Sequence, residues 1–154
     1  MRFAPDRDER QPTRPARIHT VNEAAMRVLY VEDHPVNIEV MRAIFGLRPH
    51  LILDVAIDGA SGLNAASRHT PDLLLLDLRL PDCHGTGLLA QLRALPALGH
   101  TPAIAVTAED APDLTRSTFL ETWPKPLNIR QVLARLDQLY THHVQQRAAV
   151  AVPA

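Results

Sequence analysis

The chain has 154 residues with a formal net charge of −1, and 46% of them are hydrophobic while 4% are aromatic. This length suits one domain with tails, and the near-neutral charge gives no electrostatic attraction toward nucleic acid or an anionic membrane. A single cysteine, Cys83, excludes an internal disulfide framework, and the absence of a signal-peptide core or a membrane-spanning apolar stretch predicts a cytoplasmic protein.

The first part of the chain changes character near Met26. Residues 1–25 mix arginines, acids and prolines without an apolar period, which predicts a disordered N-terminal extension. Residues 27–31 form an apolar run that is typical of a strand, and this run stops at the acidic pair Glu32 and Asp33. The residues that follow recur at helical spacing and predict a first helix closed by a proline: Val36, Val40, Ile44, Leu47 and Pro49.

The middle of the chain repeats this alternation. Residues 51–56 predict a second strand, and residues 63–67 a short second helix. The four leucines of residues 73–76 fit a strand buried on both faces, as in a parallel sheet covered by helices. This run ends abruptly in Asp77, and residues 87–95 predict a third helix after the turn.

The last part of the chain predicts two more strands and two more helices. Residues 103–106 form an apolar strand that stops at Thr107, and residues 111–120 carry the start signals of a shortened fourth helix. A short fifth strand near residues 122–123 leads to Lys125. Asn128 with Gln131 then resembles a capping box that opens a final helix with a clear apolar period.

Three of these strands stop at polar groups, and in open α/β sheets the carboxyl ends of the strands share one edge, where ligands bind. The residues expected to converge there are Glu32, Asp33, Asp77, Thr107 and Lys125. Clustered carboxylates repel each other unless a cation lies among them, and hard oxygen ligands favour Mg²⁺. A lysine and a hydroxyl suit an incoming phosphoryl group. The residues therefore predict a Mg²⁺-assisted site that accepts a phosphoryl group.

Four segments together resemble the receiver domains of two-component response regulators. They are residues 28–37, 76–85, 105–108 and 125–126, in the family's order, and the resemblance runs from about Met26 to Tyr140. It implies a flavodoxin-like (βα)5 three-layer α/β sandwich with a parallel sheet in the strand order 2-1-3-4-5. We thus expect a receiver domain over residues 26–141 and a flexible C-terminal tail over residues 142–154.

The resemblance also implies roles for the converging residues. Asp77 would be the phosphoacceptor, with Thr107 and Lys125 contacting the phosphoryl group and a cis bond between Lys125 and Pro126. The Mg²⁺ ligands implied are Glu32, Asp33, Asp77 and the backbone carbonyl of Arg79. The implied partner is a histidine kinase or a histidine phosphotransfer protein that docks near the first helix. The segment at residues 33–37 is most similar to receivers attached to, or served by, hybrid sensor kinases.

Two departures from the family pattern lie between Thr107 and Lys125. The interval is shorter than usual, and Thr122 occupies the position of an aromatic residue that receivers couple to the hydroxyl. We therefore expect intact phosphorylation chemistry but weakened dimerisation through the fourth helix and fifth strand. We also hypothesise that Arg79 and Glu109 form an ion pair over the phosphoryl group that hinders attacking water.

Three functions compete. The first is a stand-alone receiver in a two-component phosphorelay, a monomer or weak dimer without a DNA-binding domain that catalyses only its own phosphorylation and dephosphorylation. The alternative is a degenerate receiver that acts as a phosphorylation-independent interaction module. A phosphohydrolase with an aspartyl nucleophile is disfavoured, because such enzymes carry a second aspartate two residues later and Arg79 stands there.

Overall fold

One parallel sheet organises the chain, and its strand order is β2-β1-β3-β4-β5, as expected. The computed structural model describes residues 25–110 and 112–151. The strands are β1 (Met26–Val31), β2 (Leu51–Ala56), β3 (Leu73–Leu76), β4 (Ala103–Thr107) and β5 (Glu121–Pro124). The helices are α2 (Pro35–Phe45), α3 (Gly59–Arg68), α4 (Gly85–Arg93) and α5 (Ile129–Ala151), with a short 3-10 turn η1 at Pro96–Leu98.

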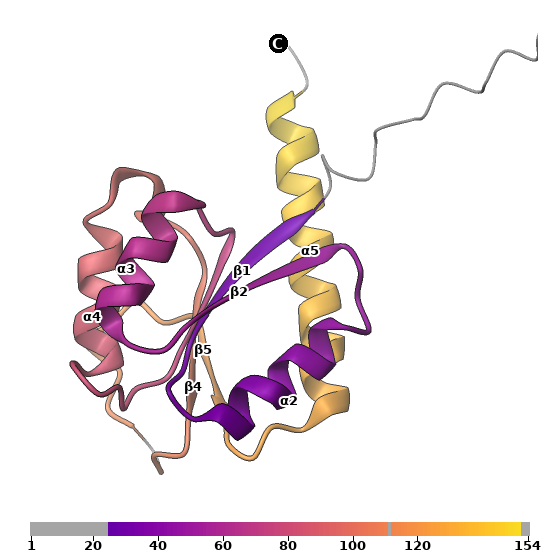
Figure 1. Cartoon of the computed structure of the whole chain (residues 1–154). Coiled ribbons are helices and arrows are strands. Elements are labelled where there is room, and N and C mark those ends of the chain that lie inside the picture. Colours follow the sequence, from indigo (N-terminus) through magenta and orange to yellow (C-terminus); the bar gives the residue numbers. More distant parts are fainter. Residues whose placement is uncertain (1–24, 111, 152–154) are drawn as a thin grey trace, which may run out of the picture.

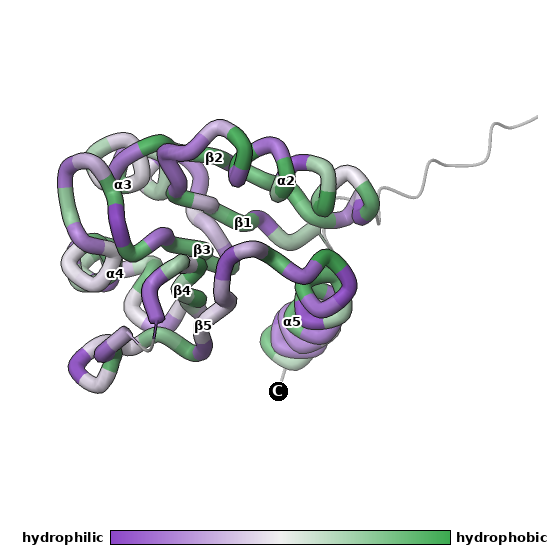
Figure 2. Tube along the Cα trace, turned by 90° about the horizontal axis from the view of Figure 1, so that it is seen from below, coloured by the Kyte–Doolittle hydropathy of each residue, from purple (hydrophilic) through white to green (hydrophobic). Residues whose placement is uncertain are grey.

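The helices cover both faces of the sheet and make three layers (Figures 1 and 2). Helices α2 and α5 lie on one face, and α3 and α4 lie on the other. Each face has its own apolar core, and alternate residues of a strand enter opposite cores. In β3, Leu73 and Leu75 join the core under α2 and α5, while Leu74 and Leu76 join the core under α3 and α4. This confirms the prediction that the leucine run is buried on both faces.

Helices α3 and α4 begin earlier than predicted, at Gly59 and Gly85 rather than at residues 63 and 87. Polar side chains cap both amino ends. Asp58 and Ser61 form a capping box at α3, and the Asp82 carboxylate accepts hydrogen bonds from the backbone N–H groups of the first two residues of that helix. The imidazole Nδ1 of His84 accepts from the backbone N–H of Thr86 at α4.

The predicted fourth helix is wrong, because the described residues 112–120 contain no helix. Hydroxyl and carboxyl side chains there bond to nearby backbone groups, which competes with helical hydrogen bonding. Asp113 accepts from the backbone N–H and hydroxyl of Thr115, and Ser117 donates to the Leu114 carbonyl. We call residues 112–120 the β4–β5 loop. The predicted start of the helix, residue 111, lies outside the described residues.

Arg93 on α4 holds the β4–β5 loop in place. Its guanidinium donates to the hydroxyl of Thr118 at 2.9 Å and to the carbonyl of that residue at 3.3 Å. The same group also donates to the carbonyls of Leu98 and Thr101. One side chain therefore joins the loop to the segment between α4 and β4, where a fourth helix would otherwise pack.

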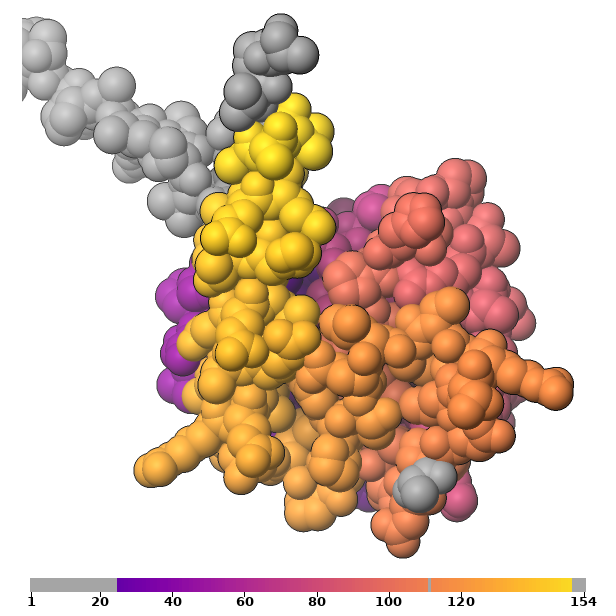
Figure 3. Space-filling model, turned by 180° about the vertical axis from the view of Figure 1, so that it is seen from behind, coloured from indigo at the N-terminus to yellow at the C-terminus, as the bar shows by residue number. Residues whose placement is uncertain are grey.

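Helix α5 is longer than predicted. It begins after Asn128, whose side-chain oxygen accepts from the backbone N–H of Gln131, and it continues to Ala151. Residues 142–151 are therefore helical, although we expected a flexible tail from residue 142 onward. Figure 3 shows the end of this helix standing clear of the sheet. The predicted N-terminal extension, apart from residue 25, and residues 152–154 lie outside the described residues. Among the described helices, none combines the length and hydropathy required to cross a membrane.

Candidate functional site

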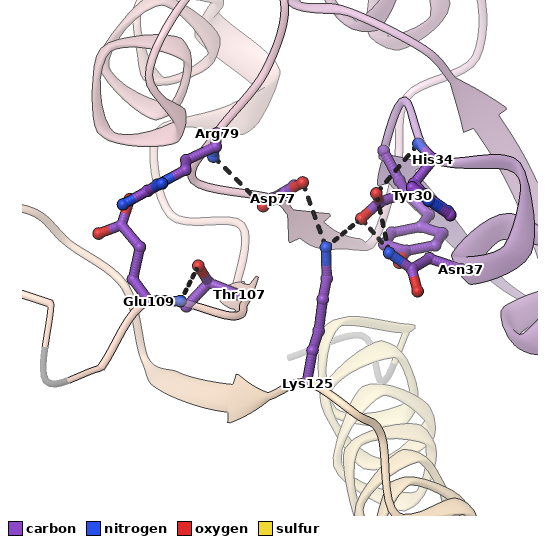
Figure 4. A network of polar contacts seen from close by, with 9 residues as sticks. Tyr30, His34, Asn37, Asp77, Arg79, Thr107, Glu109 and Lys125 are labelled. Carbon is purple, nitrogen blue, oxygen red and sulfur yellow. Dashed lines mark hydrogen bonds and ion pairs between the residues drawn. The ribbon is translucent and has the colours of Figure 1, made fainter.

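The polar strand ends meet at one edge of the sheet, as predicted (Figure 4). Glu32 and Asp33 follow β1, Asp77 follows β3, Thr107 ends β4, and Lys125 follows β5. These five residues line one cleft of about 440 Å³. The parallel arrangement of the strands accounts for this meeting, because it brings all their carboxyl ends to the same edge.

Three carboxylates in the cleft could hold a metal ion. Glu32, Asp33 and Asp77 each offer one oxygen atom, and these atoms lie within 4.8 Å of one another. Glu32 and Asp77 are buried, whereas Asp33 is exposed. A set of hard oxygen donors beside an open cleft fits Mg²⁺, which keeps several waters and takes only one or two carboxylates directly. The residues present therefore fit the ion that the sequence predicts.

Lys125 lies between two of these acids. Its ammonium is 2.5 Å from Oε2 of Glu32 and 3.2 Å from Oδ2 of Asp77. The backbone N–H of Lys125 also donates to the carbonyl of Thr107 at 2.9 Å, and the bond to Pro126 is cis, as expected. The lysine therefore partly neutralises the acidic cleft and stands where it can reach a group bound to Asp77.

The two buried acids have opposite pKa shifts. Burial, together with the negative charge of Glu32, raises the pKa of Asp77 above its usual value, although Lys125 and the backbone N–H of Arg79 act against this. Burial also acts against the charge of Glu32, but hydrogen bonds from Lys125 and Asn37 hold the pKa of Glu32 below its usual value. Glu32 is thus the stable anion of the pair.

Thr107 and Arg79 are also at the cleft. The Thr107 side chain is buried, and its hydroxyl oxygen accepts from the backbone N–H of Glu109 at 3.1 Å. The backbone N–H of Arg79 donates to Oδ1 of Asp77 at 3.2 Å. This contact brings the Arg79 peptide to the acceptor carboxylate, and the role of its carbonyl as a metal ligand stays a prediction.

The expected ion pair between Arg79 and Glu109 is present, with 3.1 Å between Nε and Oε1. Sequence reasoning missed a third member of this group: Nε2 of His84 lies 3.4 Å from the same oxygen. It also missed Tyr30 and Asn37, which both donate to Glu32. Tyr30 lies two residues before Glu32 on the same strand, so the period of two was a signal that could have revealed it.

The departure at β5 is visible in the structure. Thr122 is exposed, and Trp123 is 7% exposed and belongs to the core under α2 and α5. The indole N–H of Trp123 donates to Glu121, which also pairs with Arg135 on α5. The aromatic residue of this strand is therefore occupied in the core, away from Thr107.

Comparisons with known proteins agree on one family. The profile of the response regulator receiver domain matches residues 28–137. The transcriptional activator protein PfeR of Pseudomonas aeruginosa is 38% identical over 117 residues, which cover 73% of this chain and 37% of that protein. An uncharacterized 14.6 kDa protein of Leptolyngbya boryana is 34% identical over 76% of this chain and 91% of its own length.

Solved structures show the same likeness. The receiver domain of the sensor histidine kinase PA1611 from Pseudomonas aeruginosa, crystallised with magnesium in its active site cleft, matches with a TM-score of 0.68 and 25% identity. That match covers 76% of this chain and 98% of the receiver domain. The chain spans only 37% of PfeR and 54% of the regulator TrcR of Mycobacterium tuberculosis.

Proposed function

We propose, because the chain belongs to the response regulator receiver domain family, that it accepts a phosphoryl group onto Asp77 from a phosphohistidine of a partner protein, in a Mg²⁺-dependent reaction. The observation that carries this proposal is the position of Lys125 between Glu32 and Asp77. A lysine there neutralises the acids in the resting protein and is in place to pair with a phosphoryl group. The exposed Asp33 completes the acidic set at the open side of the cleft.

The chemistry follows from the groups in the cleft. A carboxylate oxygen of Asp77 attacks phosphorus, the new O–P bond forms as the N–P bond breaks, and the bonding electron pair returns to the imidazole of the donor. Lys125 turns toward the phosphoryl oxygens, and the Thr107 hydroxyl donates to one of them. Mg²⁺, when bound, supplies positive charge that bridges donor and acceptor oxygens. The protein contributes position and charge and turns over no separate substrate.

The partner in this proposal is a histidine kinase or a histidine phosphotransfer protein of a two-component phosphorelay. The first turn of α2 lies beside the cleft, and Asn37 within it lines the cleft wall. Val36 in the same turn is 62% exposed and offers an apolar contact next to the acceptor. A partner that brings its phosphohistidine to Asp77 would meet this turn.

Intact mass after incubation with Mg²⁺ and acetyl phosphate tests the proposal. We expect one added phosphoryl group in the wild-type protein, and none in Asp77→Asn or after the metal is chelated. Asp110→Asn is the matched control, because Asp110 lines the same cleft and has no proposed role, so it should still gain the group. Added mass that persists in Asp77→Asn would contradict Asp77 as the acceptor.

One observation favours a second function. The β4–β5 loop replaces the fourth helix, and Thr122 is exposed, so the surface beside β5 differs from the family pattern. A receiver that kept its acids but acts as a phosphorylation-independent interaction module would show this combination. The absence of added mass from both acetyl phosphate and a phosphorylated histidine phosphotransfer protein would favour this second function.

A further inference from the structure

Tyr30 lies beneath the acidic cleft. The side chain is 0% exposed, and its ring belongs to the core under α2 and α5. Residues two apart on a strand point to the same face, so Tyr30 extends along the sheet toward Glu32. Its hydroxyl donates to Oε2 of Glu32 at 3.2 Å (Figure 4). Burial of a hydroxyl without a partner is unfavourable, and Glu32 provides the partner here.

Glu32 has two donors on each of its oxygens. Oε1 accepts from the backbone N–H of His34 at 3.1 Å and from the side-chain amide of Asn37 at 3.2 Å. Oε2 accepts from Lys125 at 2.5 Å and from Tyr30 at 3.2 Å. A carboxylate has about four lone-pair sites. The orientation of Glu32 is therefore determined by four contacts that come from β1, α2 and the segment after β5.

The two donors on Oε2 differ in what they can do. Lys125 also contacts Asp77, and in the proposed reaction it turns toward the phosphoryl group. Tyr30 comes from the buried side and has no such second task. When Lys125 leaves, the Tyr30 hydroxyl is the donor that keeps Oε2 of Glu32 in place at the metal site.

We propose that Tyr30 is a positioning residue for the Mg²⁺ site, whose hydroxyl holds the Glu32 carboxylate in the orientation that attracts the metal. This inference rests on the proposed function. Outer-shell hydrogen bonds of this kind contribute about 10–100-fold to metal affinity or activity when they are removed. The Tyr30 bond is long for a charge-assisted hydrogen bond, so we expect the lower end, an increase in the Mg²⁺ dissociation constant of about ten-fold for Tyr30→Phe.

The experiment is an amide NMR titration of the full chain with MgCl₂, for the wild type and for Tyr30→Phe. Phenylalanine keeps the ring and removes only the hydroxyl. The matched control is Tyr140→Phe, because the chain has two tyrosines and Tyr140 lies on α5, where its ring contacts His50 at 4.2 Å. We expect the control to bind Mg²⁺ like the wild type. A Tyr30→Phe dissociation constant within two-fold of the wild type would overturn the inference.

A second comparison separates positioning from packing. If Tyr30 acts through Glu32, adding Tyr30→Phe to Glu32→Gln should leave the Mg²⁺ affinity of the single variant Glu32→Gln unchanged. A further loss in the double variant would assign Tyr30 a merely structural role. Failure of the proposed function itself is distinguishable, because the wild-type protein would then show no Mg²⁺-dependent shifts at the cleft.

Discussion

Replacement of Lys125 by methionine should lower the free energy of unfolding by about 3 kcal/mol. Lys125 is 13% exposed, and its partners Glu32 and Asp77 are 1% and 8% exposed, so both contacts are buried. Removal of one partner of a buried ion pair leaves an uncompensated charge and typically costs about 3–5 kcal/mol. We expect the lower end, because Asp77, whose pKa is already raised by burial, can take up a proton.

Urea unfolding with and without Mg²⁺ measures this effect. With a slope of about 1.5 kcal/mol per molar urea, the midpoint should fall by roughly 2 M. Mg²⁺ should restore much of the loss, because a cation bound to the folded state alone stabilises it by mass action. Arg48→Met is the matched control: Arg48 pairs with Asp137 at 2.8 Å, but both side chains are partly exposed, so this variant should lose only about 0–1 kcal/mol.

Two results would refute this reasoning. A midpoint for Lys125→Met no lower than that of Arg48→Met would mean that Lys125 does not compensate the buried acids. An equal gain from Mg²⁺ in the wild type and in Lys125→Met would mean that the lysine and the metal do not share the same acids.

Three further outcomes are expected. Asp77→Asn should raise the free energy of unfolding by about 1 kcal/mol near pH 7; the pKa of Asp77 is raised in the folded state, so its favourable contribution is present at low pH and lost as pH rises, and urea unfolding at acidic pH should show no such gain. Arg79→Gln combined with Glu109→Gln should shorten the lifetime of the phosphorylated protein, measured by the decay of its intact mass, and an unchanged decay would remove their pair as a barrier to water. Sedimentation with and without acetyl phosphate should show no new dimer, and a phosphorylation-dependent dimer that maps to β5 would contradict the weakened interface.

The sequence predicted the sheet and the cleft because both depend on short-range patterns. The leucine run of β3 can only be a strand buried on both faces, and a parallel sheet then places Asp77 at the same edge as Glu32 and Thr107. Lys125 required more, because only the family resemblance connected this lysine to acids that lie far away in the chain. Its two contacts at 2.5 and 3.2 Å confirm the connection.

The errors have a common physical origin in contacts that no local pattern contains. Pro112 is a good helix start, but the hydroxyl-rich residues after it bond to their own backbone, and Arg93 holds the resulting loop from another helix. The capping role of His84 was missed because histidine is not among the preferred N-cap residues. The length of α5 was missed because the apolar period that marks the helix stops near Tyr140, although the helix does not.

The replacement of the fourth helix changes where a signal from Asp77 can travel. No proposed site residue lies in the β4–β5 loop, so the cleft keeps its geometry without a fourth helix. Thr107 is joined to the approach to this loop by the hydrogen bond from Glu109, and Arg93 joins the far end of the loop to α4. By contrast, Trp123 is held in the core, and Thr122 is exposed.

A shift of the Thr107 hydroxyl toward a phosphoryl group should therefore pass through Glu109 into the β4–β5 loop and reach Arg93. We predict that phosphorylation changes the amide NMR shifts of Thr118 and Ser117 more than that of Thr122. Arg93→Met should widen the response by releasing the loop from α4, since this variant removes the hydrogen bonds to Thr118. Phosphorylation shifts confined to the cleft and β5, with a silent loop in both proteins, would disprove this route.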